Sequence, residues 1–367
     1  MHPLIKNSFT MQVFCMVVML TLPSCGKGQV DYGLNDFAHY EPLEFSGYSN
    51  EDDLFLGRPQ GLAIINDRLV ITDYYDRKYL TWATLDLKSF ARNVDRGTGP
   101  GEISSSATIF RTENPEIVKM QDFSAGRIYS FRWNDMLKGR FSKPIKTDHV
   151  GQSRERLALV GDNYVCYDII DDDRLLFSVV GPDGDIIYRF GEFPGEYHHE
   201  NPGNRFVRMS LTECMVAANS GGSVFVAGGF KTDFLAFYKL TDQGGSLIKQ
   251  YFTYSPDNEI KYYNVNGQEA YSYKSNDKTI NAYRGLTASE HYLLALYDGT
   301  KALSDDKPDY RYLQVFDWDG NFIKGYKLNR RLGAMAFDEK SETLYALGLG
   351  EDGESRIYTY RLSGLPK

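Results

Sequence analysis

Short apolar runs alternate with polar turns along most of the chain. In six segments two apolar runs flank a turn built from Asn, Asp, Gly or Ser: residues 61–74, 107–122, 157–168, 215–229, 285–299 and 334–348. Apolar runs of this length that are bounded by turn residues predict β-hairpins. One supersecondary unit therefore recurs through the chain, which is typical of a repeat architecture.

A second hairpin follows each of the first five units, with tight-turn sequences at residues 182–184 (PDG) and 318–321 (WDGN). The sixth copy gives only one further strand, residues 356–362. We expect residues 39–45 (HYEPLEF) to supply its missing outer strand, where Pro42 is tolerated on an edge. The predicted fold is all-β: a six-bladed β-propeller of four-stranded antiparallel blades with almost no helix, its ring closed by an amino-terminal strand in the last blade.

The first residues have the features of an export signal. Residues 11–22 are apolar and too few to span a bilayer, and Leu22-Pro23-Ser24-Cys25 follows them. This sequence is similar to the lipobox of bacterial lipoproteins, in which the cysteine thiol receives a diacylglyceryl group and becomes the first mature residue. The alternative is an ordinary signal peptide with a coincidental cysteine. We expect a signal peptide over 1–24, a polar tether over 25–38 and the propeller domain over 39–367.

The first blade carries a resemblance. Residues 57–82 (GRPQGLAIINDRLVITDYYDRKYLTW) resemble an NHL-type blade, and the whole chain resembles the TolB-like six-bladed propeller lipoproteins of Bacteroidota. The resemblance implies the architecture and the lipid anchor. It implies no chemistry, because propellers host lyases, hydrolases and binding proteins alike.

Composition narrows the partners and the compartment. The formal net charge of −8 leaves no domain-wide basic surface, so no nucleic-acid partner is expected. Besides Cys25, the mature chain contains only Cys166 and Cys214, both in apolar runs. Export would permit a disulfide between these two, and buried free thiols are the alternative.

The glycine-rich stretch Gly97-Thr98-Gly99-Pro100-Gly101 lies between predicted strands. It lacks the G-x-G-x-x-G spacing, and no helix pattern follows to direct N–H groups at a phosphate. We interpret it as a connector from the outer strand of the first blade to the inner strand of the second, with glycines that are free to adopt positive φ.

A basic residue recurs near the start of each third strand: Arg77, Arg127, Arg174, Lys231, Arg311 and Arg356. These residues predict either a basic collar around one channel mouth or ion pairs within each blade. Asp73, Asp122 and Asp168 are the acids expected for such pairs.

Two connections exceed what the repeat requires, residues 193–212 and 254–284. Their Tyr, Asn, His and Arg content is suited to a polar recognition surface. Together with a further arginine of the first blade, the densest cluster gives the ligand-binding candidates Tyr197, His198, His199, Arg205, Arg208 and Arg58. We expect no metal site, because adjacent histidines in a strand face opposite ways, and we assign no catalytic residue and no cofactor.

The sequence therefore predicts a monomeric envelope protein, attached to a membrane through lipidated Cys25 and its acyl chains (palmitate among them). The outer membrane facing the periplasm is the expected location. The propeller would bind or scaffold an envelope protein, peptide or glycan. The alternative is a metal-dependent propeller enzyme of the lactonase, esterase or lyase type, with its site in the central channel.

Overall fold

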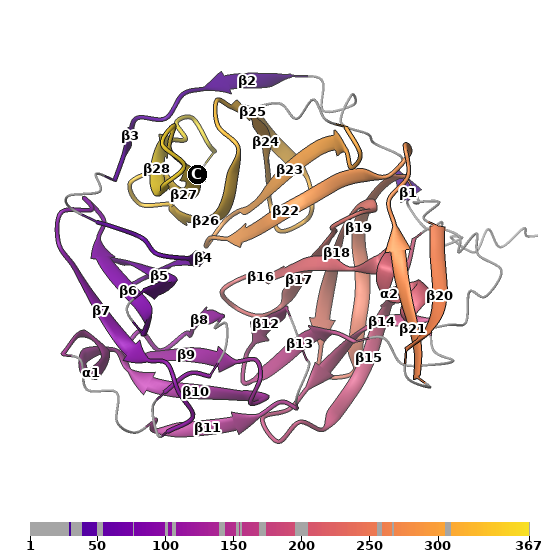
Figure 1. Cartoon of the computed structure of the whole chain (residues 1–367), viewed down its shortest axis with the longest axis horizontal. Coiled ribbons are helices and arrows are strands. Elements are labelled where there is room, and N and C mark those ends of the chain that lie inside the picture. The colour runs from indigo at the N-terminus through magenta and orange to yellow at the C-terminus, as the bar shows by residue number, and fades with distance from the viewer. Residues whose placement is uncertain are drawn as a thin grey trace, which may run out of the picture.

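The computed structural model is a ring of six antiparallel sheets around a central channel (Figure 1). It describes residues 29–30, 39–49, 54–75, 77–99, 102–104, 108–138, 144–151, 154, 156–168, 174–194, 205–254, 259–265, 268–304 and 310–366. The predicted six-bladed β-propeller is confirmed. No helix among these residues is long and apolar enough to cross a membrane.

Each blade follows the predicted order of strands, from the innermost outward. Blade 1 contains β4 (Pro59–Ile65), β5 (Arg68–Tyr75), β6 (Lys78–Thr84) and β7 (Phe90–Asp95). Blade 2 contains β8 (Ile109–Arg111), β9 (Ile117–Asp122), β10 (Arg127–Arg132) and β11 (Lys146–His149), with helix α1 (Trp133–Leu137) before its last strand. Blade 3 contains β12 (Leu157–Val160), β13 (Asn163–Tyr167), β14 (Leu175–Val180) and β15 (Ile186–Glu192).

The other three blades include strands from the amino-terminal part of the chain. Blade 4 contains β16 (Cys214–Ala218), β17 (Val224–Gly229), β18 (Asp233–Thr241) and β19 (Gly244–Tyr254), and β1 (Gln29–Val30) is added outside β19. Blade 5 contains β22 (Ile280–Ala288), β23 (Leu293–Lys301), β24 (Arg311–Phe316) and β25 (Phe322–Leu328), with β2 (Tyr40–Leu43) outside. Blade 6 contains β26 (Leu332–Asp338), β27 (Thr343–Leu349), β28 (Ser355–Arg361) and, as its outer strand, β3 (Gly47–Tyr48).

The ring is closed by an amino-terminal strand in the last blade, as predicted, but a different segment does it. Residues 40–43, within the segment expected to close the ring, pair parallel with β25 as a fifth strand of blade 5. Gly47–Tyr48 pair antiparallel with β28 and complete blade 6. Tyr40 has a buried partner in blade 5, because Gln314 donates a hydrogen bond to its hydroxyl over 2.9 Å. This contact holds the strand one blade earlier than the repeat count suggests.

The core lies between blades. The described apolar residues form six clusters, and each cluster joins two neighbouring sheets around the ring. One of them packs Leu69 and Ile71 of blade 1 against Tyr345 and Ile357 of blade 6. The second and third strands of each blade are covered on both faces, which explains their continuous apolar runs in the sequence. Closing the ring buries the remaining interface, between blades 1 and 6.

Two connectors carry regular structure that the sequence did not predict. Helix α2 (Arg205–Thr212) lies between blades 3 and 4, and the hairpin of β20 (Glu259–Val265) and β21 (Gln268–Lys274) lies between blades 4 and 5. Gln29–Val30 fall within the predicted tether and pair with β19. Part of that segment therefore lies against blade 4.

Candidate functional site at the channel mouth

The strand order places one end of every blade at the same face of the ring. Because neighbouring strands are antiparallel, the first strand begins, the second ends, the third begins and the fourth ends at this face. We call it the front face, and the opposite one the back face. The innermost strands β4, β8, β12, β16, β22 and β26 surround the channel (Figure 1).

A single buried carboxylate gathers three arginines at the front face. Asp298, near the end of β23, is 3% exposed. Its Oδ2 lies 3.2 Å from Nη2 of Arg311, 3.1 Å from Nη2 of Arg331 and 3.8 Å from Nε of Arg284. Arg284 belongs to the innermost strand β22, Arg311 opens β24, and Arg331 precedes β26 of the next blade. Three guanidinium groups thus share one carboxylate.

The excess of positive charge affects Arg311 most. The pKa of Arg311 is lowered to about 10, chiefly by burial and also by the neighbouring Arg331 and Arg284, against the opposing effect of Asp298. A guanidinium resists deprotonation, so this lowered pKa indicates a charge that is poorly solvated and incompletely neutralised. An anion placed among these arginines would be favoured.

Phe230, in the loop after β17, extends the cluster. The guanidinium carbon of Arg284 lies 4.0 Å from the centre of the Phe230 ring. Arg156 lies 5.6 Å and Lys231 5.7 Å from the same ring. The π-face of an aromatic ring attracts cations. Phe230 therefore links cationic residues from blades 3, 4 and 5.

Backbone hydrogen bonds hold the Phe230 loop in place. Its N–H donates to the carbonyl of Glu213 over 2.8 Å, and its own carbonyl accepts from the N–H of Ala282 over 3.1 Å. The carboxylate of Glu213 accepts from Nη2 of Arg156 at 2.5 Å. The loop is therefore fixed to the starts of two innermost strands, β16 and β22.

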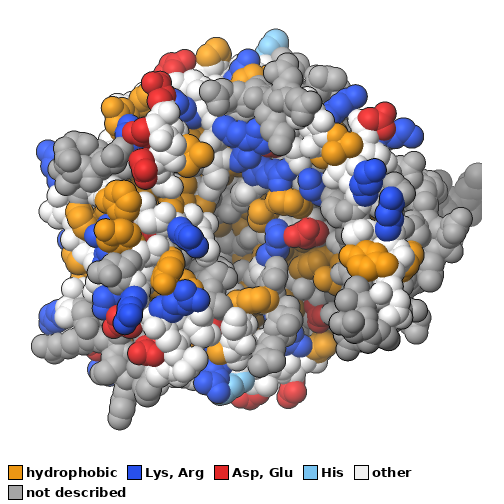
Figure 2. Space-filling view, in the orientation of Figure 1, with side chains coloured by type: hydrophobic (Ala, Val, Ile, Leu, Met, Phe, Trp, Pro, Cys, Tyr) orange, Lys and Arg blue, Asp and Glu red, His pale blue; other side chains and the backbone are white. Residues whose placement is uncertain are grey.

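These side chains make the mouth strongly basic on an otherwise acidic protein. The formal net charge of the chain is −8. Five cationic side chains and two carboxylates, an excess of three positive charges, form what we call the mouth cluster: Arg156, Lys231, Arg284, Arg311, Arg331, Glu213 and Asp298. Viewed along the channel axis, Lys and Arg side chains gather around the central hollow (Figure 2). Such a concentration of one charge sign attracts ligands of the opposite sign.

Of the ion pairs predicted within the blades, Arg311 pairs with Asp298 and Arg356 with Asp352, whereas Asp73 and Asp168 bind groups other than the expected arginines. Asp73 accepts hydrogen bonds from the backbone N–H groups of Gly57 and Arg58, at 3.0 and 2.7 Å. Burial raises the pKa of Asp73, against the opposing effect of these bonds. Asp168 accepts from the Ser178 hydroxyl at 2.8 Å. These carboxylates fix the geometry of their own blades, because an N–H group or a hydroxyl lies nearer than the expected arginine.

The ligand-binding candidates predicted from the sequence do not lie together in the structure. Arg58 is exposed at the start of β4, on the front face. Arg208 is 3% exposed, so its side chain lies inside the fold and not on the surface that the sequence predicted. The reason is that α2 turns this position inward, together with Leu211 and Thr212. Arg205 begins α2, and its side chain is outside the described set. Tyr197, His198, His199 and Cys25 lie outside the described residues.

The sequence contains a signal for the mouth cluster at the start of the first strands, whereas the recurring basic residues were predicted at the start of the third strands. An arginine stands at or just before the start of the first apolar run in four of the six units: Arg58, Arg156, Arg284 and Arg331. First strands line the channel in a propeller, so an arginine at their start is directed to the mouth. Asp298 and Phe230 have no comparable signal, because some of their partners come from other blades: Arg331 for Asp298, and Arg156 and Arg284 for Phe230.

The glycine-rich connector joins β7 to β8 as predicted, but its glycines serve a different purpose. Neither Gly97 nor Gly99 adopts a positive φ. A Cβ atom on Gly97 would lie 1.9 Å from a carboxylate oxygen of Glu102, which accepts the N–H of Gly99 at 2.8 Å. The glycines thus make room for Glu102, whose carboxylate takes an N–H that a phosphate would need.

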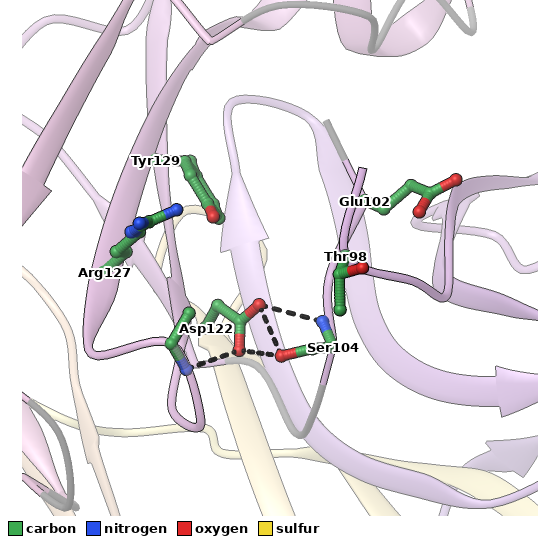
Figure 3. A pocket seen from close by; sticks show the side chains of 7 residues that line it. Thr98, Glu102, Ser104, Asp122, Arg127 and Tyr129 are labelled. Atoms are coloured by element: carbon green, nitrogen blue, oxygen red, sulfur yellow. Dashed lines mark hydrogen bonds between the residues drawn. The ribbon is translucent and has the colours of Figure 1, made fainter. Parts of the chain in front are cut away.

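A small pocket lies beside this connector (Figure 3). Its volume is about 200 Å³, and it is lined by Thr98, Glu102, Ser104, Asp122, Ala125, Arg127 and Tyr129. Asp122 accepts hydrogen bonds from the N–H and the hydroxyl of Ser104, both at 2.8 Å. Its carboxylate therefore already holds the connector against blade 2.

Among the residues that the structure describes, neither metal-binding side chains nor thiols form a second candidate site besides the mouth cluster. This part of the chain contains no group of three or more His, Cys, Asp or Glu side chains arranged to hold a metal ion. Cys166 and Cys214 are free and fully buried in different inter-blade clusters. Burial raises the pKa of each thiol to about 12. Of the two alternatives for these cysteines, the structure shows buried free thiols.

Fold and site together define a six-bladed propeller with a basic channel mouth. The chain matches the model of the TolB-like 6-blade propeller-like family over residues 44–340, and it belongs to that family. None of the curated proteins matches it in sequence.

Two solved structures share the fold. One is a putative exported protein (BF0058) from Bacteroides fragilis NCTC 9343, with a TM-score of 0.53 and 13% identity, covering 92% of this chain and 98% of that one. The other is a member of the DUF4221 family from Bacteroides vulgatus ATCC 8482, with a TM-score of 0.53 and 12% identity, covering 87% and 95%. At such identities the likeness shows the fold alone.

Proposed function

We propose that the protein is a lipid-anchored binding module of the cell envelope that captures an anionic group of its partner at the front face. The observation that carries the proposal is the excess of three positive charges among the described residues of the mouth cluster, which are organised around the Asp298 carboxylate and the Phe230 ring. The arginines are held by Asp298 and Phe230 before any ligand arrives. Preorganised donors of this kind cost less to immobilise on binding.

The partner is a protein, a peptide or a glycan that carries carboxylate or phosphate groups. Exposed apolar side chains accompany the basic mouth on the front face. Phe55 and Tyr75 are 38% and 39% exposed, with ring centres 5.1 Å apart, and Arg92 lies over the Tyr75 ring at 4.7 Å. Aromatic and arginine side chains are the ones that contribute most at interfaces. A polymer with acidic groups can contact both regions at once.

The envelope location is supported by the sequence and by the relatives. The lipobox-like residues 22–25 predict acylation at Cys25, and one solved relative of the same fold is described as exported. Two or more acyl chains on a lipoprotein amino terminus give stable anchoring. We place the anchor in the outer membrane, facing the periplasm.

Binding is tested with three probes: hexaglutamate, an oligogalacturonate, and an uncharged oligosaccharide of the same length. We expect calorimetry to detect the two acidic probes, with an affinity that falls as NaCl is added. Arg284→Gln and Arg331→Gln should each weaken binding about tenfold, because each removes a charge-assisted hydrogen-bond donor. The matched control is Arg361→Gln, since Arg361 ends β28 at the back face. Equal binding of the uncharged probe, or no loss in either mouth variant, contradicts the proposal.

The metal-dependent enzyme that the sequence left as an alternative stays a prediction. Metal analysis of the mature protein, purified without chelators, separates it from the binding module. About one tightly held divalent ion per chain would favour the enzyme.

A further inference from the structure

Four exposed apolar side chains lie at the back face of blades 3 and 4. Ile186 and Ile187 begin β15 and are 41% and 51% exposed. Leu247 and Ile248, near the start of β19, are 43% and 37% exposed. Fourth strands begin at the back face, so both pairs belong to the outer edge of that face. We call these four residues the back-face rim.

The strands that carry the two halves of the rim, β15 and β19, contact each other. The Tyr188 hydroxyl donates a hydrogen bond over 2.9 Å to the carbonyl of Thr241, in the turn that leads into β19. A Cβ atom on Gly245 would lie 2.4 Å from the Phe190 ring. The turn between β18 and β19 and the start of β19 therefore lie against the middle of β15, which places both apolar pairs on the outside of the same pair of blades. Exposed apolar side chains gathered on one part of a surface mark a site of interaction with a protein or a membrane.

The amino-terminal segment leads to the same place. β1 pairs parallel with β19, with Gln29 opposite Gln250 and Val30 opposite Tyr251. Because the two strands are parallel, Gln29 is the end of β1 that lies nearer to the start of β19, on the side of the back face. Cys25 precedes Gln29 by four residues. Whatever path these residues follow, they span at most about 14 Å.

We propose that the back-face rim rests on a lipid bilayer, beside the acyl chains on Cys25, and that the mouth cluster consequently faces away from the membrane. This inference rests on the lipidation in the proposed function. The link of four residues between Cys25 and Gln29 keeps the propeller close to the membrane surface. For aliphatic side chains close to an anchor, transfer from water to the boundary between headgroups and acyl chains is favourable in free energy.

The charges beside the rim define the kind of lipid surface. Asp183 and Asp185 precede the first pair of apolar residues, and Asp242 precedes the second. All three are exposed. The two lysines that border the rim, Lys239 and Lys249, do not fully balance these three carboxylates. Anionic headgroups are therefore repelled, and the rim is suited to a zwitterionic surface.

The test uses the full lipidated protein in vesicles of phosphatidylcholine that contain nitroxide-labelled lipid. A small fluorophore is attached to cysteine in Leu247→Cys or, as the matched control, in Leu349→Cys, a leucine 61% exposed at the front-face end of β27. We expect strong quenching at position 247 and none at position 349. Adding Ile187→Asp to the Leu247→Cys protein should reduce the quenching at least about threefold, because it opposes insertion. Replacing half of the lipid by an anionic one should also reduce it.

The outcomes separate this inference from the proposed function. If the protein floats with the vesicles but is quenched equally at both positions, or only at position 349, the contact of the rim with the bilayer is contradicted. The lipid anchor on Cys25 is not. A protein that carries no lipid by mass spectrometry and does not float overturns both the anchor and the rim. Binding of hexaglutamate by the floated protein, unchanged from the detergent-solubilised protein, confirms that the mouth faces water.

Discussion

The guanidinium carbon of Arg284 lies 4.0 Å from the centre of the Phe230 ring, where blades 4 and 5 meet. Arg284 belongs to the innermost strand of blade 5, and Phe230 to a loop of blade 4. This contact holds a cation at the channel mouth without neutralising it, since an aromatic ring carries no net charge. The ring therefore leaves the charge of Arg284 intact, and the Asp298 carboxylate lies 3.8 Å from its Nε.

Replacing Phe230 with leucine should weaken ligand binding without unfolding the protein. Leucine keeps an apolar side chain but has no π-face, so Arg284 loses its cation–π contact. We expect the affinity for hexaglutamate to fall about threefold to tenfold, the equivalent of a cation–π contact of about 1 kcal/mol. Calorimetry measures this. Trp82→Leu is the control, because the guanidinium carbon of Arg68, which begins β5 at the back face, lies 5.8 Å from the Trp82 ring, and an equal loss in both variants would contradict the role of Phe230.

Replacing Asp298 with asparagine should destabilise the protein, and an added anion should restore part of the loss. The three arginines would retain their charges without a carboxylate, at a cost of about 2–3 kcal/mol in the free energy of unfolding, less than for a fully buried group because Arg331 is partly exposed. Urea unfolding with and without phosphate measures both effects. We expect phosphate to stabilise the Asp298→Asn variant more than the wild type. Equal stabilisation would contradict the need for an anion at this place.

The contact between His291 and Glu339 should contribute stability only in mildly acidic solution. The hydrogen bond that the His291 ring donates to the Glu339 carboxylate raises the pKa of His291 above its ordinary value of 6.5. A raised pKa in the folded state means that the contribution is full below the unfolded value of about 6.5 and is lost as the pH rises through the folded value. His291→Gln should therefore lower the urea midpoint at about pH 6 and leave it unchanged at about pH 9. A loss that is the same at both pH values would rule out the ion pair.

Cys166 and Cys214 should be inert in the folded protein. Both are fully buried, and burial raises the pKa of each thiol to about 12, which leaves almost no thiolate at neutral pH. A thiol reagent should modify neither cysteine in the native protein. It should modify both after unfolding in urea. Rapid reaction in native protein, or no reaction after unfolding, would contradict the buried free thiols.

The blades could be predicted from the sequence because their signals are local. The turn predicted at residues 182–184 contains Gly184 with φ +89°, and the turn at 318–321 contains Gly320 with φ +78°. Each such turn joins strands that are neighbours in the chain. Alternation and turn chemistry within about 15 residues are enough to define a hairpin.

The closing strand and the mouth depend on contacts between distant segments. Pro42 and its apolar neighbours are suited to any outer edge, and only the packing of Tyr40 on blade 5 decides which edge is used. Arg156, Arg284 and Arg331 each open an apolar run in the sequence. Their convergence on the region of Asp298 and Phe230 follows from the geometry of the closed ring, which no single unit contains.

The most direct test of the central claim is to locate an anion in the channel mouth. Crystals of the mature protein soaked in selenate would show bound anions by their anomalous scattering. The account predicts a peak within hydrogen-bond distance of the Arg284 and Arg331 guanidinium groups, absent in crystals of Arg331→Gln. Selenate bound only elsewhere on the surface, or bound at the mouth with equal strength in that variant, would contradict it.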